Sequence, residues 1–125
     1  MPNLNTTCAF TRAQRLFSAE EFKKVFEKPY KSADGYFTVL ATANQLPQAR
    51  LGLAIARKYV KPATVRNRIK RLVRESFRHH QQSLRGLDCV VLAKSRIVQV
   101  DNAELFSALS RHWQKLARAR QNDSP

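Results

Sequence analysis

The stretch that most constrains this chain is TVRNRIKRLVRESFR, residues Thr64 to Arg78. Its apolar side chains recur at helical spacing, and at about 100° per residue they fall within an arc of roughly 140°; they are Val65, Ile69, Leu72, Val73 and Phe77. Six of the fifteen residues are basic: Arg66 and Arg68 on the flanks, and Lys70, Arg71, Arg74 and Arg78 with Asn67 around the opposite pole. The pattern predicts an amphipathic helix with one core face and one cationic face.

The net charge of the chain is very high for its size. Its 125 residues are expected to form a single domain, residues 1–125, with an ordered core of about 12–118. The formal net charge is +14, and such self-repulsion is tolerated when the usual partner is a polyanion. Between Gly35 and Leu87 the only acidic residue is Glu75, against eleven Lys or Arg. Nucleic acid, an anionic membrane and an acidic protein are the candidate partners.

The apolar runs and the cysteines indicate the cellular compartment of the protein. No apolar run approaches the roughly 20 residues that span a bilayer, and the N-terminal residues lack the pattern of a signal peptide. Cys8 and Cys89 match no metal-site spacing. We therefore expect a cytoplasmic protein whose cysteines are ordinary small side chains.

A short helix is expected before the basic one. Ser18 and Glu21 have the spacing of a capping box, and Phe17 and Phe22 that of a hydrophobic staple across it. This helix should end before Pro29.

The basic helix and a last helix have their own boundary signals. Thr64 is the expected N-cap of the basic helix, which should run to about Leu84 and stop at Gly86. A final helix is expected to open at Asp101 and to fray beyond Arg118; its buried stripe is Leu105, Leu109, Trp113 and Leu116.

Three apolar runs are expected to be strands: 36–43, 51–56 and 88–93. The polar residues 44–48 have the right length for a hairpin, residues 30–35 should turn, and the nearly all-apolar second run should be central. Ile97–Val100 or a segment near Tyr30 would add a fourth strand. A helix between the second and third runs makes those two strands parallel if they share a sheet.

The titratable residues do not suggest a protein-borne active site. No pair of carboxylates stands in an obvious acid/base arrangement, and there is no phosphate-cradling Gly loop or nucleophile elbow. His79 and His80 point two ways on a helix, which makes them a poor metal chelate. We interpret them, with His112, as solvated or half-buried side chains.

The basic helix favours a polyanion over a merely solvated face. Like charges recur at Lys70/Arg74, Arg71/Arg74 and Arg74/Arg78, and each such pair costs a few tenths of a kcal/mol without a compensating anion. Arg outnumbers Lys five to one, which suits forked contacts to phosphate. The apolar face is small and needed for the core, so a membrane-surface helix is disfavoured. Asn67 is open to two readings, a capping residue or a hydrogen-bonding group for a sugar or base edge.

The aromatic residues also have two interpretations. Phe22 and Phe26 are by default core, yet such rings stack on single-stranded RNA when they lie along a positive groove. Tyr36 and Phe37 point to opposite faces of their strand, so only one is expected in the main core.

The motif R-N-R-I-K-R-L-x-R-E-x-F-R, here Arg66 to Arg78, resembles the RNR signature of the bacterial ribonuclease P protein component. The similarity extends over roughly residues 12–118 and includes F-x-x-V-F at Phe22–Phe26, LGLAIARK at Leu51–Lys58 and DCVVLAK at Asp88–Lys94. It implies an α+β fold, a two-layer α/β sandwich with an about four-stranded central sheet and three helices in the order α-β-β-(β)-α-β-α. A left-handed βαβ crossover like that of domain 2 of ribosomal protein S5 is also implied, against the usual hand.

The resemblance also implies a function. A catalytic RNA, with Mg²⁺ bound mainly by that RNA and no cofactor held tightly by the protein, removes the 5′ leader of precursor tRNA. The protein is expected to act as a monomer in a 1:1 complex, without DNA or membrane partners. The RNA-binding positions carried over from the motif are Arg57, Lys58, Arg66, Asn67, Arg68, Lys70, Arg71 and Arg74; Phe22 and Phe26 carry over to a leader-binding cleft, with no catalytic or metal-binding residue in the chain. Some family members carry a strand Tyr where this chain has Leu40, and Tyr36, on the same strand face, is our candidate substitute.

Three other functions are weighed against this one. A ribosomal-RNA-binding protein would use the same basic helix. A helix-turn-helix DNA-binding protein would need a short paired helix before Thr64, which the sequence does not offer. A nuclease with its own active site lacks candidate residues.

Overall fold

A computed structural model describes residues 18–123 of the chain. Three helices and four strands make an α+β fold, as the sequence predicts, and a short 3₁₀ helix is added to them. In chain order the elements are α1 (Ala19–Val25), β1 (Tyr30–Ala33), β2 (Phe37–Ala43), β3 (Arg50–Ala54), α2 (Ala63–His80), β4 (Leu87–Ala93), η3 (Ser95–Gln99) and α3 (Asn102–Asp123). The four strands form one mixed sheet in the order β1-β2-β4-β3.

β4 is the inner strand that joins the two halves of the sheet. It pairs antiparallel with β2 on one edge and parallel with β3 on the other. The expected hairpin at residues 44–48 is therefore wrong, and so is the central place of the second strand, because β3 is an edge strand. The physical reason is burial: β4 is apolar on both faces, and its Val90 and Val91, which point to opposite sides, are both fully buried.

The fourth strand is β1, the alternative near Tyr30. It pairs antiparallel with β2, so only the end of the 30–35 segment turns, at Asp34 and Gly35. The carboxylate of Asp34 accepts hydrogen bonds from the backbone N–H groups of Tyr36 and Phe37 and so fixes that turn. The other alternative, near Ile97, is the 3₁₀ helix η3.

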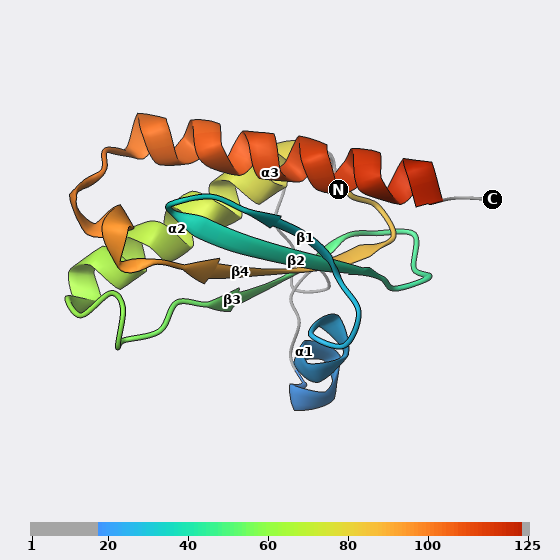
Figure 1. Cartoon of the computed structure of the whole chain (residues 1–125), viewed down its shortest axis with the longest axis horizontal. Coiled ribbons are helices and arrows are strands. Elements are labelled where there is room, and N and C mark those ends of the chain that lie inside the picture. The colour runs from blue at the N-terminus through green and yellow to red at the C-terminus, as the bar shows by residue number, and fades with distance from the viewer. Residues whose placement is uncertain (1–17, 124–125) are drawn as a thin grey trace, which may run out of the picture.

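Two helices cover one face of the sheet, and a single short helix lies against the other. Figure 1 shows α3 along the top of the molecule, α2 crossing behind the sheet from the lower left to the upper right, and α1 below the sheet. The main core lies between the sheet and the pair α2/α3. A much smaller cluster, Val25, Leu40 and Val90, joins α1 to the opposite face.

The basic helix turns its apolar stripe into the main core. Ile69, Leu72, Val73 and Phe77 are buried as predicted, and Val65 at the start of the helix is half-buried. Ser76 also faces inward, where its hydroxyl accepts a 2.8 Å hydrogen bond from the Trp113 indole of α3. The Phe77 and Trp113 rings meet edge to face with centroids 5.7 Å apart.

The ends of α2 differ from those expected. The helix begins at Ala63 with Pro62 as N-cap, so Thr64 is not the capping residue. It ends at His80 rather than near Leu84, and residues 81–86 form turns that lead into β4. Gly86 has a φ of 84° in the last turn, so the glycine serves the turn before β4 and not the helix terminus.

The last helix has the predicted start and a longer end. The Asp101 carboxylate accepts a hydrogen bond from the Glu104 backbone, as its capping pattern indicates. The four residues of the expected stripe are buried. The helix continues past Arg118 to Asp123, because Leu116 is buried and the Arg120 side chain donates to the Arg85 carbonyl beyond α2.

α1 has the capping box expected from the sequence. Ser18 accepts from the Glu21 backbone at 3.1 Å, and the Glu21 carboxylate accepts from the Ser18 backbone at 3.1 Å. The helix ends at Val25, before Pro29, as predicted. Phe17, the other half of the expected staple, lies outside the described residues.

A partly buried ion-pair cluster holds α1 to the sheet. Arg50 of β3 grips Asp88 of β4 through two hydrogen bonds of 2.8 Å and reaches the Glu21 carboxylate of α1 at 2.6 Å. Asn44 adds a 2.8 Å hydrogen bond to Asp88. One guanidinium thus ties three elements together in the forked geometry that arginine favours.

We predict that Arg50→Ala lowers the free energy of unfolding by roughly 3 kcal/mol, because it leaves the Asp88 carboxylate buried without its charge partner. Urea denaturation followed by circular dichroism measures the change. Arg111→Ala, which removes an exposed arginine of α3, is the control and should shift stability by less than about 0.5 kcal/mol. Equal stability of the two variants would contradict the clamp.

Candidate nucleic-acid interface

The outer face of α2 forms a cationic hollow. A depression of about 480 Å³ is lined by Asn67, Lys70, Arg71, Arg74, Glu75 and Arg78. Four of the predicted RNA-binding residues, Asn67, Lys70, Arg71 and Arg74, are thus brought together on one surface. Glu75, the single acidic side chain there, is engaged by Arg78 and lies 3.1 Å from the His79 ring.

Asn67 is not a capping residue. The helix begins four residues earlier, and the Asn67 side chain is exposed at the edge of the cationic hollow. Within residues 18–123 the structure gives its amide no hydrogen-bond partner. The interpretation of Asn67 as a capping residue is therefore wrong, while a hydrogen bond from its amide to a sugar or base edge stays a prediction.

Arg66 supports the loop between β3 and α2. Its guanidinium donates to the carbonyls of Val60 and Lys61 at 2.9 and 2.7 Å, and Val60 is fully buried. The loop is therefore held at both points, and its Arg57 and Lys58 remain exposed. The structure places Arg66 as a support for these two cations rather than in the hollow.

Arg68 faces the other helix. Its guanidinium donates to the Asn102 side chain at the start of α3. Arg68 therefore lines a second hollow, between α2 and α3, together with Leu72 and Phe106.

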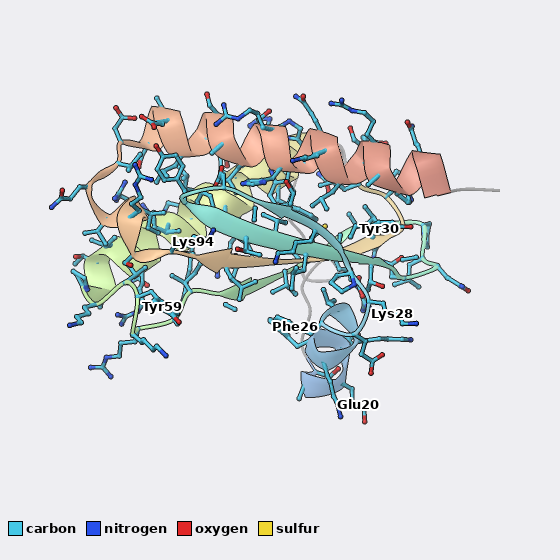
Figure 2. The ribbon with its side chains drawn as sticks, viewed as in Figure 1. Glu20, Phe26, Lys28, Tyr30, Tyr59 and Lys94 are labelled. Atoms are coloured by element: carbon cyan, nitrogen blue, oxygen red, sulfur yellow. The ribbon has the colours of Figure 1, made fainter. Side chains whose placement is uncertain are left out.

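The two aromatic residues of α1 lie at the opposite face of the sheet. Phe22 is half-buried and packs against the small cluster around Val25, while Phe26 at the helix C-cap is 46% exposed. Figure 2 shows Phe26 below the sheet, beside α1, whereas Glu20 and Lys28 point away from the sheet. Phe26 is thus an accessible ring on the side of the sheet where Leu92 and Ala54 pack, half-buried, against the small cluster.

Tyr36 does not join these rings. It precedes β2, and its ring packs against the main core, on the side of α3. Its hydroxyl donates to Glu104, a contact that raises the pKa of Tyr36, and the Arg96 guanidinium lies 5.9 Å from its ring centroid. Leu40 lies on the α1 face, so the expectation that Tyr36 shares its face and replaces a tyrosine there is wrong.

A buried polar cluster between β1 and α3 escaped the sequence analysis. Ser32 and His112 are joined by a 2.6 Å hydrogen bond through Nδ1, and His112 Nε2 lies 3.0 Å from the Asp34 carboxylate. The three residue types match a nucleophilic triad, yet Ser32 and His112 are each only 3% exposed, so a substrate does not reach the hydroxyl. Their spacing of 80 residues gave no local signal.

Burial governs the ionisation of this cluster. Burial lowers the pKa of His112, although the Asp34 carboxylate acts in the opposite direction. Burial would raise the pKa of Asp34, but backbone hydrogen bonds from Phe37 and Tyr36, with the attraction of His112, bring it below the ordinary value. The imidazole is thus held neutral in the fold near pH 7.

The remaining predictions concern the cysteines, metal sites and membrane-spanning helices. Cys89 is a free, fully buried thiol whose pKa is raised by burial, and Cys8 lies outside the described residues. Among residues 18–123 no three His, Cys, Asp or Glu side chains gather as a metal site. No helix in that part of the chain is both long enough and apolar enough to cross a bilayer.

A basic α+β protein with a cationic helix face belongs to the class of small RNA-binding proteins, and comparison with known proteins narrows that class. The family profile described as Ribonuclease P matches residues 10–117. A ribonuclease P protein component from Vibrio cholerae serotype O1 is 44% identical over 113 residues, which cover 90% of this chain and 96% of the relative.

Solved structures agree with this match. A Staphylococcus aureus RNase P protein mutant with defective mRNA degradation activity superposes with a TM-score of 0.78 at 26% identity, over 94% of this chain and 98% of that one. The RNase P protein from Thermotoga maritima gives a TM-score of 0.67 at 31% identity, over 78% and 96%. The chain therefore belongs to the family of bacterial ribonuclease P protein components. Membership implies a part in tRNA processing by an endoribonuclease, with an RNA partner in a ribonucleoprotein.

The depressed pKa of His112 predicts a loss of stability in acid. A group whose pKa is lower in the folded state stabilises the fold at pH values above its ordinary pKa, which is 6.5 for histidine. That stabilisation is lost as the pH falls from the ordinary pKa through the lower pKa of the folded state. The free energy of unfolding should therefore drop more steeply from pH 7 to 5 in the natural protein than in His112→Asn. Stability that rises over this range would show that attraction to Asp34 outweighs burial.

Proposed function

We propose that this chain is the protein subunit of ribonuclease P, which binds the catalytic RNA through the outer face of α2 and the 5′ leader of precursor tRNA through the aromatic flank of α1. It assists the Mg²⁺-dependent endonucleolytic removal of the leader, which leaves the mature 5′ end of the tRNA. The observation that carries the proposal is the cationic hollow of α2 in a chain of this family.

The electrostatics of α2 favour RNA phosphates as the partner. Lys70 and Arg74, and Arg74 and Arg78, are four residues apart on one helix, where like charges destabilise each other. The apolar side of the same helix is fully used by the core, so these cations face outward. Phosphates along an RNA strand relieve the repulsion and release their own counterions on binding.

The chain's role is positioning, and we place the catalytic site in the RNA. Mg²⁺ is expected to be bound mainly by that RNA, as the family resemblance implies. The protein's cations reduce the repulsion between RNA and substrate strands, which lets the complex form at lower Mg²⁺. One copy of the chain for each RNA is sufficient for this role.

The leader is assigned to the other face of the sheet. Phe26 is exposed and Phe22 half-buried, and the side chains of Lys31 and Leu40 share that sheet face through the β1–β2 register. Rings beside a cation suit a single strand, because stacking tolerates any base while the charge follows the backbone. Tyr36 is left out of this surface.

We predict that Arg74→Ala weakens binding to the catalytic RNA and lowers the slope of log affinity against log salt by about 0.7 to 0.9, the loss of one phosphate contact. Filter binding from low to moderate salt measures both. Arg118→Ala on α3 removes the same charge away from the hollow and should leave the slope nearly unchanged. If the affinity of the natural protein for the RNA does not depend on salt concentration, the electrostatic part of the proposal is contradicted.

A cleavage assay tests the leader assignment. The natural protein should enhance cleavage of precursor tRNA at low Mg²⁺ only when the catalytic RNA is present. Phe26→Ala should weaken binding of leader-bearing substrate by roughly 5- to 150-fold, since one base–aromatic stack contributes about 1–3 kcal/mol, and should not change binding of mature tRNA. Equal losses for both substrates would show that Phe26 does not contact the leader.

A further inference from the structure

One row of α2 side chains separates two different hollows. Asn67, Arg71 and Glu75 are spaced four residues apart, so they form a ridge along the helix surface. All three line the cationic hollow and also line the hollow between α2 and α3. A strand that crosses this ridge therefore meets two chemically different surfaces within one helix width.

The hollow between the helices has an apolar floor. It measures about 540 Å³ and exposes more apolar than polar surface, in contrast to the cationic hollow. Leu72 of α2 and Phe106 of α3 supply the floor, and Thr64, Arg68 and Asn102 supply the rim. Phe106 is half-buried, and its ring meets the His79 ring edge to face at 6.4 Å, which limits its orientation.

The electrostatics at this hollow suit a nucleotide. Contacts from Arg68 to Asn102 and from Ser76 to Trp113 show that α2 and α3 run in the same general direction, so Arg68, in the second turn of α2, lies beside the start of α3. The N-cap of α2 is Pro62, which provides no side-chain hydrogen bond to the first turn. The backbone N–H groups of Val65 and Arg66 donate to the Pro62 carbonyl, so the positive charge at this hollow comes from the Arg68 side chain.

The ridge also carries groups that read a base edge. The Asn67 amide offers both donors and an acceptor, and within the described residues it has no hydrogen-bond partner. Glu75 is the one carboxylate that lines both hollows, and it already accepts hydrogen bonds from Arg78. A carboxylate repels phosphate but accepts hydrogen bonds from the amino group of a base.

We propose that the groove between α2 and α3 binds one unpaired nucleobase of the partner RNA, stacked on Phe106, while the adjoining phosphates lie in the cationic hollow. The inference rests on the proposed function and adds to it a base-recognition site beside the phosphate contacts. The neighbouring cationic hollow supplies the charge complementarity that favours RNA over an apolar protein segment. Asn67 and Glu75 then confer a preference among bases.

Salt-dependent binding separates the base site from the phosphate contacts. Phe106→Leu keeps an apolar side chain in the groove but removes the ring, so affinity for the catalytic RNA should fall roughly 5- to 150-fold, the range for one lost stack. The salt slope should stay at the natural value, because no charge is removed. Leu46→Ala, which trims an exposed side chain elsewhere, is the control and should bind normally. Thermal unfolding verifies that both variants are folded.

The outcomes distinguish the two proposals. If Phe106→Leu binds the catalytic RNA as tightly as the natural protein does, while Arg74→Ala binds it weakly, the base site is overturned and the proposed function is kept. Natural affinity in both variants overturns the proposed function itself. Self-association that Phe106→Leu abolishes assigns the groove to a second copy of the chain and also overturns the base site.

Chemical probing of the RNA gives a direct readout. Dimethyl sulfate modifies unpaired adenine and cytosine, so a base held in the groove should be protected by the natural protein. That same nucleotide should become reactive again in saturating complexes with Phe106→Leu, while the protections caused by phosphate contacts persist. Because guanine and uracil need a second reagent, a carbodiimide is used in parallel. Identical patterns for the two proteins with both reagents overturn the site.

Discussion

The structure depends on the place of β4, which is hydrogen-bonded along both edges and buried on both faces. Its parallel partner β3 comes before α2 in the chain, and β4 comes after it. The connection must therefore cross one face of the sheet, and α2 is the part of the chain that does so. That position commits the apolar stripe of α2 to the core and directs its cations to solvent. The cationic surface is a consequence of the sheet order as much as of the helix itself.

Packing, and not local charge, stabilises this helix. Its outward side brings Lys70, Arg71 and Arg74 close together with Glu75 as the one acidic neighbour, an arrangement that weakens an isolated helix. The compensation lies on the inward side, where Phe77 packs against Trp113 and Ser76 accepts the indole N–H. A conflict between local preference and global fold is typical of functional surfaces. The RNA phosphates that we propose as partners of this face would relieve the repulsion between its cations.

The two faces of the sheet support different tasks. α2 and α3 build the main core, and α2 carries the cationic hollow. α1 is attached to the other face by a small apolar cluster and by the clamp of Arg50. The net gain from such an ion pair is small because desolvation offsets much of the attraction, whereas removing one partner alone is costly because it leaves the other charge unpaired. The clamp fixes where Phe22 and Phe26 lie relative to the sheet, and so underlies the proposed leader surface.

Local patterning was enough to predict the elements that are periodic or capped. The stripe of α2, the capping box at Ser18, the Asp101 cap and the buried stripe of α3 all follow from side-chain spacing within one turn or two. The same spacing, with the RNR motif, identified the cationic face and the family. Only the tertiary structure decided the strand order, the side on which Tyr36 lies, the supporting role of Arg66 and the contact of Ser32 with His112. These features depend on contacts between residues far apart in the chain, which the local sequence pattern does not encode. An apolar run such as Leu51–Ala56 has the same pattern whether its strand lies at the edge or at the centre of a sheet. Its pairing partner is determined by the burial of the whole sheet.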